Sequence, residues 1–329
     1  MAVLATTNLT LADLAKRQDA DKKVSKIVEI LSATNEILDD MVWVEANDGT
    51  GHKTTIRSGL PTGTWRLLNY GVQPEKSTTV QVRDGTGMLE TYSEVDRALV
   101  QLSTDPAAFL LSESKAFLEG MNQTQATTIF YGDSSVFPER FTGLAPRFNS
   151  KTSENAQNII DAGGTGSNNT SVWIVCWDES TVHGIYPKGM TAGLKQGATK
   201  EETLFDVNGG RYEGFRTHFS WNCGLTVRDW RYVVRIANID VTTLTKNAVT
   251  GGDLIDLMVQ AIELLPNVRM GRIVFYVNRT IRSFLRRQIA NKSNVWLNME
   301  EVAGRKVLTF DGIPVKRVDA ILNTEARVV

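Results

Sequence analysis

Hydrophobic residues recur at helical spacing in the first forty residues of the chain. Val24, Ile27, Val28 and Leu31 occupy positions i, i+3, i+4 and i+7, which lie on one face of a helix, while lysines and a glutamate occupy the other face. This pattern predicts one amphipathic helix in a terminal arm. Its apolar stripe needs a covering surface, supplied either by the chain's own core or by a neighbouring molecule.

Residues 46–92 alternate between strand-like runs and turns. Residues 53–58 and 78–83 are rich in threonine, valine and isoleucine, which favour strands, but they contain few large apolar residues on either face. The runs are bounded by glycine-containing turns at residues 47–51, 59–63 and 84–87. A polar two-stranded ribbon is marginal by itself. We therefore expect a protruding hairpin that lies over an adjacent molecule.

The clearest helix signal spans residues 105–131. Asp105 is a favourable N-cap, and Pro106 suits the first helical position, where its missing N–H has no cost. Leu110, Leu111, Phe117, Leu118 and Met121 are predicted to share one side. The pattern ends near Gly132, so the helix would be about 38 Å long at ~1.5 Å per residue. The preceding residues 88–102 are expected to form a strand and a short connection.

Residues 138–298 show a mixed pattern of strands and helices, so the fold class is predicted to be mixed α+β. Apolar runs predict strands at residues 171–177, 230–236 and 272–277, of which the first is a buried strand. Helices are predicted at residues 254–265, which stop at Pro266, and at 281–290. Residues 307–321 are expected to form two short strands around the Asp311-Gly312 turn.

Bulk composition is that of a globular protein, with 42% hydrophobic and 22% charged residues. The 329 residues allow for about two domains at roughly 150 residues each. A net charge of -1 provides no global basic field for non-specific binding to nucleic acid. The chain has neither a secretory signal pattern nor a run of roughly 18 apolar residues, so no membrane association is expected.

Candidate chemistry is sparse. Cys176 and Cys223 are far apart and are predicted to be buried thiols in a reducing compartment. The three histidines, His52, His183 and His218, have no zinc-like spacing. A Cys176/His183 nucleophile pair is conceivable, but Cys176 lies in the most apolar strand, where a thiolate is disfavoured.

Glycines and carboxylates give no stronger signal. The glycine cluster at 163–166 lacks the lysine of a phosphate loop and the third glycine of a dinucleotide fingerprint, so it is predicted to be a surface loop. The paired carboxylates are adjacent in sequence, which directs their side chains apart, and solvated faces are the expected result: Asp39/Asp40, Glu201/Glu202 and Glu300/Glu301. No catalytic residue, cofactor or metal is expected.

Arginines form the sharpest local charge feature. Arg279, Arg282 and Arg286 share one face of the helix predicted at 281–290, and Arg287 is adjacent to them. They could contact DNA phosphates, form salt bridges to a neighbouring subunit or belong to a solvated face. The lack of interleaved aromatic residues argues against the first of these.

Five segments, taken together, resemble the major capsid protein of short-tailed bacteriophages, in particular the epsilon-fifteen-like group, whose shells use the Hong Kong 97 capsid fold. The resemblance spans nearly the whole chain and depends on the order and spacing of residues 137–148, 161–175, 186–189, 229–240 and 307–318. It implies an N-terminal arm at 1–45, an extended loop at 46–92, a peripheral domain with a spine helix at 93–135, an axial domain at 136–300, and C-terminal strands at 301–329 that return to the peripheral domain.

The resemblance implies a function in assembly. Copies would form the hexamers and pentamers of an icosahedral head shell that encloses double-stranded DNA without sequence-specific binding. The shell would assemble in the host bacterial cytoplasm and reside in the virion. Because the chain starts without a coiled-coil segment, the scaffolding protein is expected to be separate, and a portal protein and a decoration or cement protein would be further partners.

Some relatives cross-link a lysine of the extended loop to an asparagine of the next subunit. Lys53 and Lys76 lie in the corresponding region, but nothing matches the rest of that reaction centre, so non-covalent assembly is expected. The residues expected to contact other subunits are Ile27, Leu31, Lys53, Arg57, Trp65, Lys76, Arg83, Arg279, Arg282 and Arg286. The alternatives are an encapsulin-like nanocompartment shell and, more remotely, a cytosolic hydrolase that uses Cys176 or a carboxylate pair.

Overall fold

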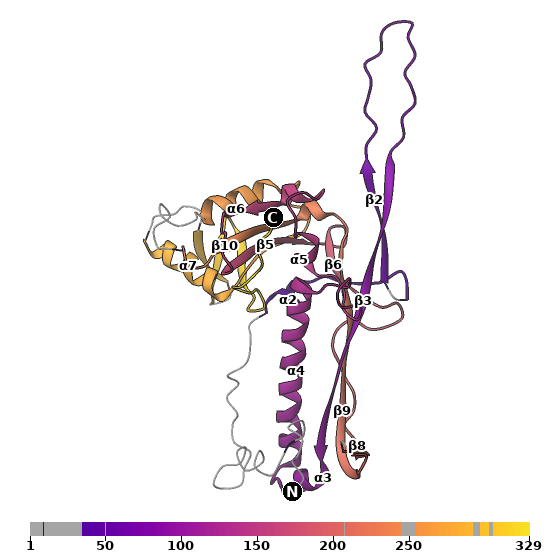
Figure 1. Cartoon of the computed structure of the whole chain (residues 1–329), viewed down its shortest axis with the longest axis vertical. Coiled ribbons are helices and arrows are strands. Elements are labelled where there is room, and N and C mark those ends of the chain that lie inside the picture. Colours follow the sequence, from indigo (N-terminus) through magenta and orange to yellow (C-terminus); the bar gives the residue numbers. More distant parts are fainter. Residues whose placement is uncertain are drawn as a thin grey trace.

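A computed structural model of the chain describes residue 9 and residues 35–49, 51–206, 208–244, 254–291, 297–302 and 305–329, with side chains described outside 288–307. Figure 1 shows a folded lobe from which one long helix and a long ribbon of strands run side by side. A narrow hairpin projects from the same ribbon in the opposite direction. The predicted mixed α+β class is confirmed by this arrangement.

The lobe is built on a mixed sheet around β5 (Asn169–Trp177), in which all nine residues are buried. β5 pairs antiparallel with β10 (Val233–Asp240) on one side and with β11 (Arg272–Val277) on the other. The sheet continues from β10 to β4 (Ile159–Asp161), and from β11 through the strands β14 (Ile313–Arg317), β13 (Arg305–Phe310) and β12 (Leu297–Val302). A strand covered on both faces is typically a continuous apolar run, and this confirms the buried strand predicted at 171–177.

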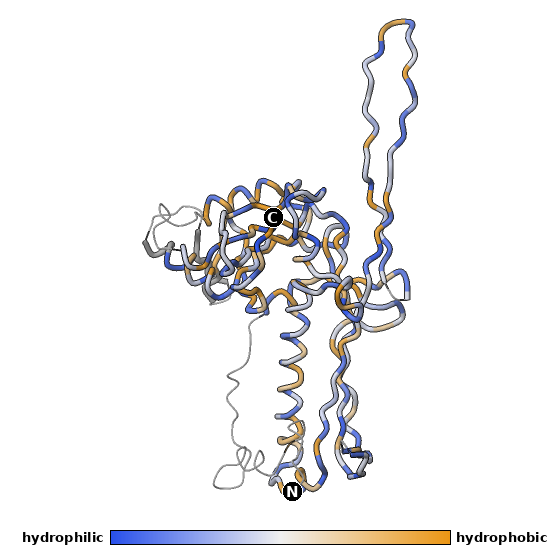
Figure 2. The backbone as a smooth tube through the Cα atoms, viewed as in Figure 1, coloured by the Kyte–Doolittle hydropathy of each residue, from blue (hydrophilic) through white to orange (hydrophobic). Residues whose placement is uncertain are grey.

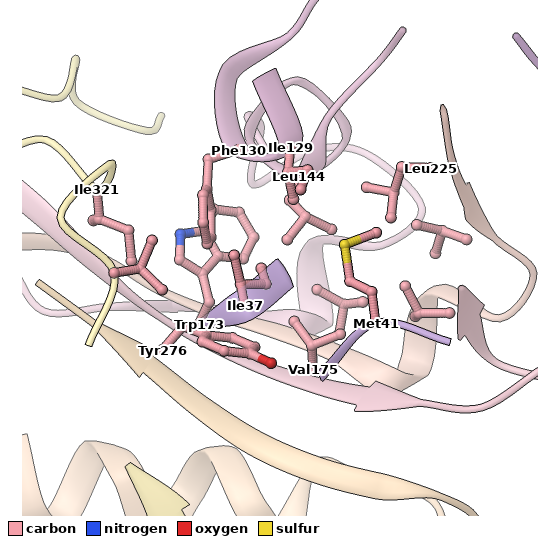
Figure 3. Close-up of a cluster of buried hydrophobic side chains, with 14 of the residues drawn as sticks. Ile37, Met41, Ile129, Phe130, Leu144, Trp173, Val175, Leu225, Tyr276 and Ile321 are labelled. Carbon is pink, nitrogen blue, oxygen red and sulfur yellow. The ribbon is translucent and has the colours of Figure 1, made fainter. Parts of the chain in front are cut away.

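Alternate residues of β5 point into two different cores. Val172, Ile174 and Cys176 face α6 (Leu254–Glu263) and α7 (Arg279–Asn291), which cover one side of the sheet. Trp173 and Val175 face the opposite core, where Phe130, Leu144 and Ile321 lie beside them (Figure 3). That second core is closed by short elements from distant parts of the chain, including α2 (Ile37–Asp40) and α5 (Leu144–Arg147). The period-two alternation of a strand thus divides the lobe into two cores.

The long helix α4 (Pro106–Tyr131) has the bounds that the sequence predicted. The Asp105 side chain accepts a hydrogen bond from the Ala108 N–H at 3.0 Å, and Pro106 occupies the first turn. Met121, Ile129 and Phe130 pack into the core, but Leu111 is exposed, so the predicted apolar side is wrong at that position. Only the C-terminal part of α4 reaches the lobe, and the rest lies along the ribbon (Figure 1).

The ribbon depends on one unusually long strand, β3 (Thr78–Asp96), of 19 residues. Its first part pairs with β2 (Gly51–Gly59), and from Thr86 onward it pairs with β9 (Arg211–Val227). At this change of partner the backbones approach closely, since a Cβ at Gly224 would lie 2.6 Å from the Gly85 carbonyl oxygen. The separate strand predicted after residue 88 is therefore part of β3, which ends where the Asp96 side chain caps α3 (Arg97–Leu102).

The remaining short elements complete the ribbon and the lobe. β8 (Lys200–Phe205) and β7 (Lys195–Gln196) pair with β9, which also pairs with β6 (Val182–Tyr186). β1 (Trp43–Glu45) pairs in parallel with β6. Two single turns of 3-10 helix precede strands of the lobe, η1 (Ala156–Asn158) before β4 and η2 (Trp230–Tyr232) before β10.

Three segments lie elsewhere than the resemblance implied. β8 and most of β9, expected in the axial region of 136–300, lie along β3 outside the lobe. Within 301–329, β14 pairs parallel with β11 and extends the lobe sheet, because the free edge of β11 offers backbone donors and acceptors. The tail beyond Val318 reaches α4, where the Leu322 N–H donates to the Tyr131 hydroxyl at 3.0 Å. Residues 35–45, assigned to the arm, are built into the core through Ile37 and Met41.

A buried ion pair fastens the C-terminal tail to the lobe. Arg235 donates to Glu325 at 2.9 Å, and both side chains are almost completely buried. Glu325 also accepts hydrogen bonds from Tyr131 and Ser171. The Arg235 guanidinium lies 4.9 Å from the centre of the Trp173 ring and donates to the Phe148 carbonyl at 2.7 Å. The pair thereby connects β10, β5, α4 and the tail.

Candidate interaction surfaces

The far end of the projecting hairpin, residues 60–77, contacts no other part of the described chain and is exposed throughout. Hydrophobic residues nevertheless gather there, as Figure 2 shows at the tip. The large exposed ones are Leu60, Trp65, Leu67, Leu68, Tyr70 and Val72, and Trp65 is fully exposed. Exposed apolar residues in one contiguous segment indicate a surface for another molecule.

Hydrogen bonds tie the two limbs of this hairpin together. The Thr62 N–H donates to a carboxylate oxygen of Glu75 at 2.6 Å, and the Ser58 and Thr78 hydroxyls lie 3.0 Å apart. At the tip the Tyr70 N–H donates to the Leu67 carbonyl at 3.2 Å. The apolar tip is therefore presented on a closed hairpin and not on two separate strands.

The structure brings five of the predicted contact residues together on this hairpin. Lys53 and Arg83 are opposite each other in the β2–β3 register, and Asp48 lies 3.8 and 3.5 Å from their charged nitrogens. Arg57 and Lys76 are exposed and form no ion pair with the described residues. Of these residues, Arg57 and Trp65 are of types that are enriched in protein interfaces.

The root of the hairpin is fixed by buried polar groups. Asp84 of β3 pairs with Arg147 of α5 at 2.8 Å, and the same guanidinium donates to the carbonyls of Thr142 and Leu225 at 3.2 Å. Asp84 is opposite His52 of β2 in the strand register. The hairpin is thus held to the lobe at its root, through the pair of Asp84 with Arg147.

Two buried histidine rings meet at the same root. His52 of β2 and His183 of β6 are 5.6 Å apart in an edge-to-face arrangement. Neither nitrogen of His183 has a hydrogen-bond partner among the described residues, and Arg228 lies 3.5 Å from His52 Nε2. Burial and the positive charge of Arg228 lower the pKa of His183 to about 4, and the same causes lower the pKa of His52. Spacing along the sequence did not suggest this cluster, because its members come from separate strands.

Arginines line a second candidate surface on the lobe. Arg279, Arg282, Arg286 and Arg287 of α7, with Arg317 at the end of β14, surround a groove of about 550 Å³. Arg279 and Arg317 pair with Asp319, and Arg282 lies 3.5 Å from Glu36. Arg286 and Arg287 are exposed and have no carboxylate partner in the described part of the chain. The predicted arginine face therefore exists, with part of its charge uncompensated.

The predicted arm contacts Ile27 and Leu31 lie outside the described residues. The segment that follows them is anchored to the lobe by Asp40, whose buried carboxylate lies 2.6 Å from Lys316 Nζ and 2.7 Å from the Arg272 guanidinium. The Tyr276 hydroxyl donates to the same carboxylate at 2.9 Å. The prediction that Asp40 is solvated is therefore wrong. Ile37, three residues earlier on the same helical turn, is also buried, and its apolar side chain indicated that this face of α2 packs on the core.

Cys176 and Cys223 are buried free thiols, as predicted. Desolvation raises the pKa of the Cys176 thiol, and it raises the pKa of Cys223 to about 12. Since His183 lacks a hydrogen-bond partner in the described chain, no Cys176–His183 pair is formed. Glu201 and Glu202 pair separately, with Arg97 and Arg216. Within the described ranges, no three His, Cys, Asp or Glu side chains are placed to hold a metal ion.

None of the helices that the structure describes combines the length and the apolar composition of a membrane-spanning segment.

Comparison with known proteins assigns this chain to a family. The family model described as major capsid protein GP7 matches residues 19–329. Among curated proteins, no relative matches.

Solved structures agree with the family match. A chain in the structure of bacteriophage Epsilon15 is 42% identical, with a TM-score of 0.81, over 100% of this chain and 99% of that one. The bacteriophage JBD30 capsid, at 8% identity and a TM-score of 0.49, matches over 90% of this chain and 95% of its own. The SrpI encapsulin of Synechococcus elongatus, at 11% identity and a TM-score of 0.46, matches over 71% of this chain and 98% of its own. The last two are too distant to support an argument.

Proposed function

This chain belongs to the major capsid protein GP7 family, and from that premise we propose that its copies associate through the extended hairpin to build the icosahedral head shell of a tailed bacteriophage. Its identity to the Epsilon15 chain over the whole length places it in the epsilon15-like group. The family is one of structural shell proteins, and the protein has its place in the virion. We assign it no enzymatic role.

One observation supports this function above the others: the hairpin tip is not covered by any of the described residues of its own chain. Trp65, Leu67, Leu68 and Tyr70 expose large apolar surfaces on a two-stranded ribbon that is held only at its root. At about 25 cal/mol per Å², covering these side chains in a neighbouring copy would contribute several kcal/mol to each contact. A ribbon of this kind is marginal alone and gains stability when another subunit covers it.

The remaining assignments follow the same reasoning. The arm before residue 35, the hairpin at 46–92 and the arginine face would contact sister copies in hexamers and pentamers. The residues proposed to contact other subunits are Ile27, Leu31, Lys53, Arg57, Trp65, Lys76, Arg83, Arg279, Arg282 and Arg286.

The core of the lobe, within 136–300, would form the axial domain, and α4 with the ribbon would form the peripheral domain. A separate scaffolding protein, a portal protein and a decoration protein are proposed partners, and assembly would occur in the host cytoplasm.

Particle formation by a hairpin variant tests the function. Residues 60–77 would be replaced by an Asn-Gly turn, which suits a two-residue β-hairpin. We expect a folded subunit that forms no closed particles under conditions in which the unaltered chain forms them, as seen by electron microscopy. A variant with residues 60–77 replaced by a Gly/Ser segment of equal length is the matched control for reach, and it too should fail to close particles. Closed particles from either variant would contradict the proposal.

A further inference from the structure

Two helices on the same side of the lobe sheet have opposite charges. Within α6 the only charged residues are Asp256 and Glu263, and both are acidic. Within α7 the charged residues are Arg279, Arg282, Arg286 and Arg287. A random surface mixes both signs, so this division between neighbouring helices calls for an explanation.

The acidic residues form an exposed stripe. Asp256, Gln260 and Glu263 occupy positions i, i+4 and i+7 of α6, and all three are exposed, while Leu254, Met258 and Ala261 face the core. The Gln260 side-chain amide donates to the Asp256 carboxylate at 2.6 Å. This hydrogen bond orients the Asp256 side chain along the stripe. The charge extends past the end of the helix, because Asp311 lines the same groove as Glu263. Arg269, in the following turn, is exposed.

The basic residues form a stripe of the same length. Arg279, Arg282 and Arg286 are at i, i+3 and i+7, so each stripe spans about 10 Å at ~1.5 Å per residue. Asp319 and Glu36 compensate part of this charge, and Arg286 and Arg287 keep theirs free within the described chain. Arginine presents a planar fork of donors that suits a carboxylate.

No ion pair joins the two stripes among the described residues. α6 packs on β10 and α7 packs on β14, and these strands are separated by β5 and β11. Three strand spacings amount to about 14 Å. Figure 1 shows α6 along the upper side of the lobe and α7 at its lower side. A second copy rotated about an axis near the lobe would bring its α6 against the α7 of the first.

We propose that the acidic stripe of α6 in one copy docks in the arginine groove of α7 in the next, and that this head-to-tail seam sets the register of the lobes in each capsomer. The inference rests on the proposed shell function and adds a specific interface to it. A heterologous contact of this type closes into a ring when the rotation between copies divides a full turn. Complementary charge suits such a contact, because it selects the register and repels wrong pairings.

Charge reversal tests the seam. In the variant R286E/R287E both the α6 stripe and the α7 groove are negatively charged, and in the variant D256R/E263R both are positively charged. Like charges then meet at every seam, so each variant should give at least tenfold fewer closed particles. The chain with all four substitutions restores opposite charges at every seam and should recover most of the particle yield. Lys188→Glu, at an exposed position outside both helices, is the control for a change of net charge.

Mixing the two reversed variants gives a sharper test. The two kinds of subunit can alternate around a ring of six without any seam of like charge, whereas a ring of five must contain one. The mixture should therefore form hexamer-based sheets or tubes and few closed particles, as judged by electron microscopy. Each reversed variant alone should form neither.

The outcomes separate this inference from the proposed function. If the unaltered chain forms no particles, the shell function fails. If it forms particles and the reversed variants do so equally well, the seam is wrong while the shell function stands. If the chain with all four substitutions does not recover its particle yield, the seam is overturned. The seam is also overturned if R286E/R287E gives normal particles that retain less nucleic acid, because the groove then binds another partner, such as phosphate.

Discussion

Two strands of nine residues show how differently one chain uses the same element. β5 in the lobe is buried along its whole length, with a core on each face. β2 in the hairpin is buried only at its first residues, Gly51, His52 and Thr54, and becomes exposed toward Gly59. β5 pairs with β10 and β11, whereas β2 pairs with β3 and is otherwise open.

The difference shows where each region obtains its stability. Burial of apolar surface stabilises β5 within one molecule. The hairpin has its root inside the molecule and its apolar residues at the far end, where none of the described residues of the chain covers them. Substitutions in the lobe should therefore change the stability of the subunit, while substitutions at the hairpin tip should change assembly alone.

The largest effect is expected from Glu325→Ala. Removing this carboxylate leaves the buried Arg235 without its charge partner, which typically costs about 3–5 kcal/mol. Denaturant unfolding of the unassembled subunit measures the loss. Glu154→Ala, at an exposed carboxylate, is the control and should change the free energy of unfolding by less than about 0.5 kcal/mol. A loss below about 1 kcal/mol for Glu325→Ala would show that the tail is not fastened by this pair.

A smaller effect that depends on pH is expected from His183→Phe. Because the folded pKa of about 4 lies below the usual histidine value of about 6.5, the unfolded chain binds the proton first. Stability is therefore complete above pH 6.5 and is lost as the pH falls toward 4, by roughly 3 kcal/mol at 1.36 kcal/mol per pKa unit.

The phenylalanine variant removes this part of the pH dependence and keeps a ring at the hairpin root. Unfolding free energies at pH 4.5 and pH 7 for both chains check the prediction. His218→Phe, at a partly exposed ring on the ribbon, is the comparison variant. Equal pH dependence in the unaltered chain and in His183→Phe would refute a role for the buried ring.

Asp105→Ala should cost about 1 kcal/mol, because it removes the N-cap of α4. Asp105→Asn keeps an acceptor oxygen and should restore most of the stability. Thermal unfolding of the two variants and the unaltered subunit measures the difference. Equal losses in both variants would indicate a role for the charge of Asp105 other than capping.

The smallest effect on stability is expected from Trp65→Ala. Its side chain is fully exposed, so the free energy of unfolding should change by less than about 0.5 kcal/mol, whereas particle yield should fall. Trp173→Ala is the matched contrast in the lobe, where loss of a buried ring should cost about 3–5 kcal/mol. A stability loss at Trp65 comparable to that at Trp173 would remove the distinction between the two regions.

Local patterns predicted the elements that depend on neighbouring residues. The Asp105-Pro106 start of α4, the apolar run of β5 and the paired strands of the hairpin all appear where the sequence indicated them. The arginine face of α7 was also predicted, since i, i+3 and i+7 positions share a side of any helix. The same positions do not indicate whether these arginines contact DNA phosphates, a neighbouring subunit or solvent.

Features that combine distant residues could not be predicted from local patterns. The glycines at 84–87 predicted a turn, and this is wrong: β3 continues through them and changes partner there. The sequence also gives no sign that β14 adds to the edge of β11. The contacts of Asp40 with Lys316 and of Arg235 with Glu325 join positions far apart in sequence. His52 and His183 likewise meet only because β2 and β6 approach the same root.

Periodicity and capping act over a few residues, so the amino-acid pattern was enough to predict α4, α6, α7, the buried strand β5 and the polar strands of the hairpin. Packing in three dimensions settles which strands are neighbours, which charges are buried and which apolar residues remain uncovered. Those outcomes depend on competition among distant segments for the same backbone partners and the same apolar surface. The fully exposed Trp65 and the fully buried Trp173 are the same residue type, and their surroundings in space make one available to other subunits and the other part of the core.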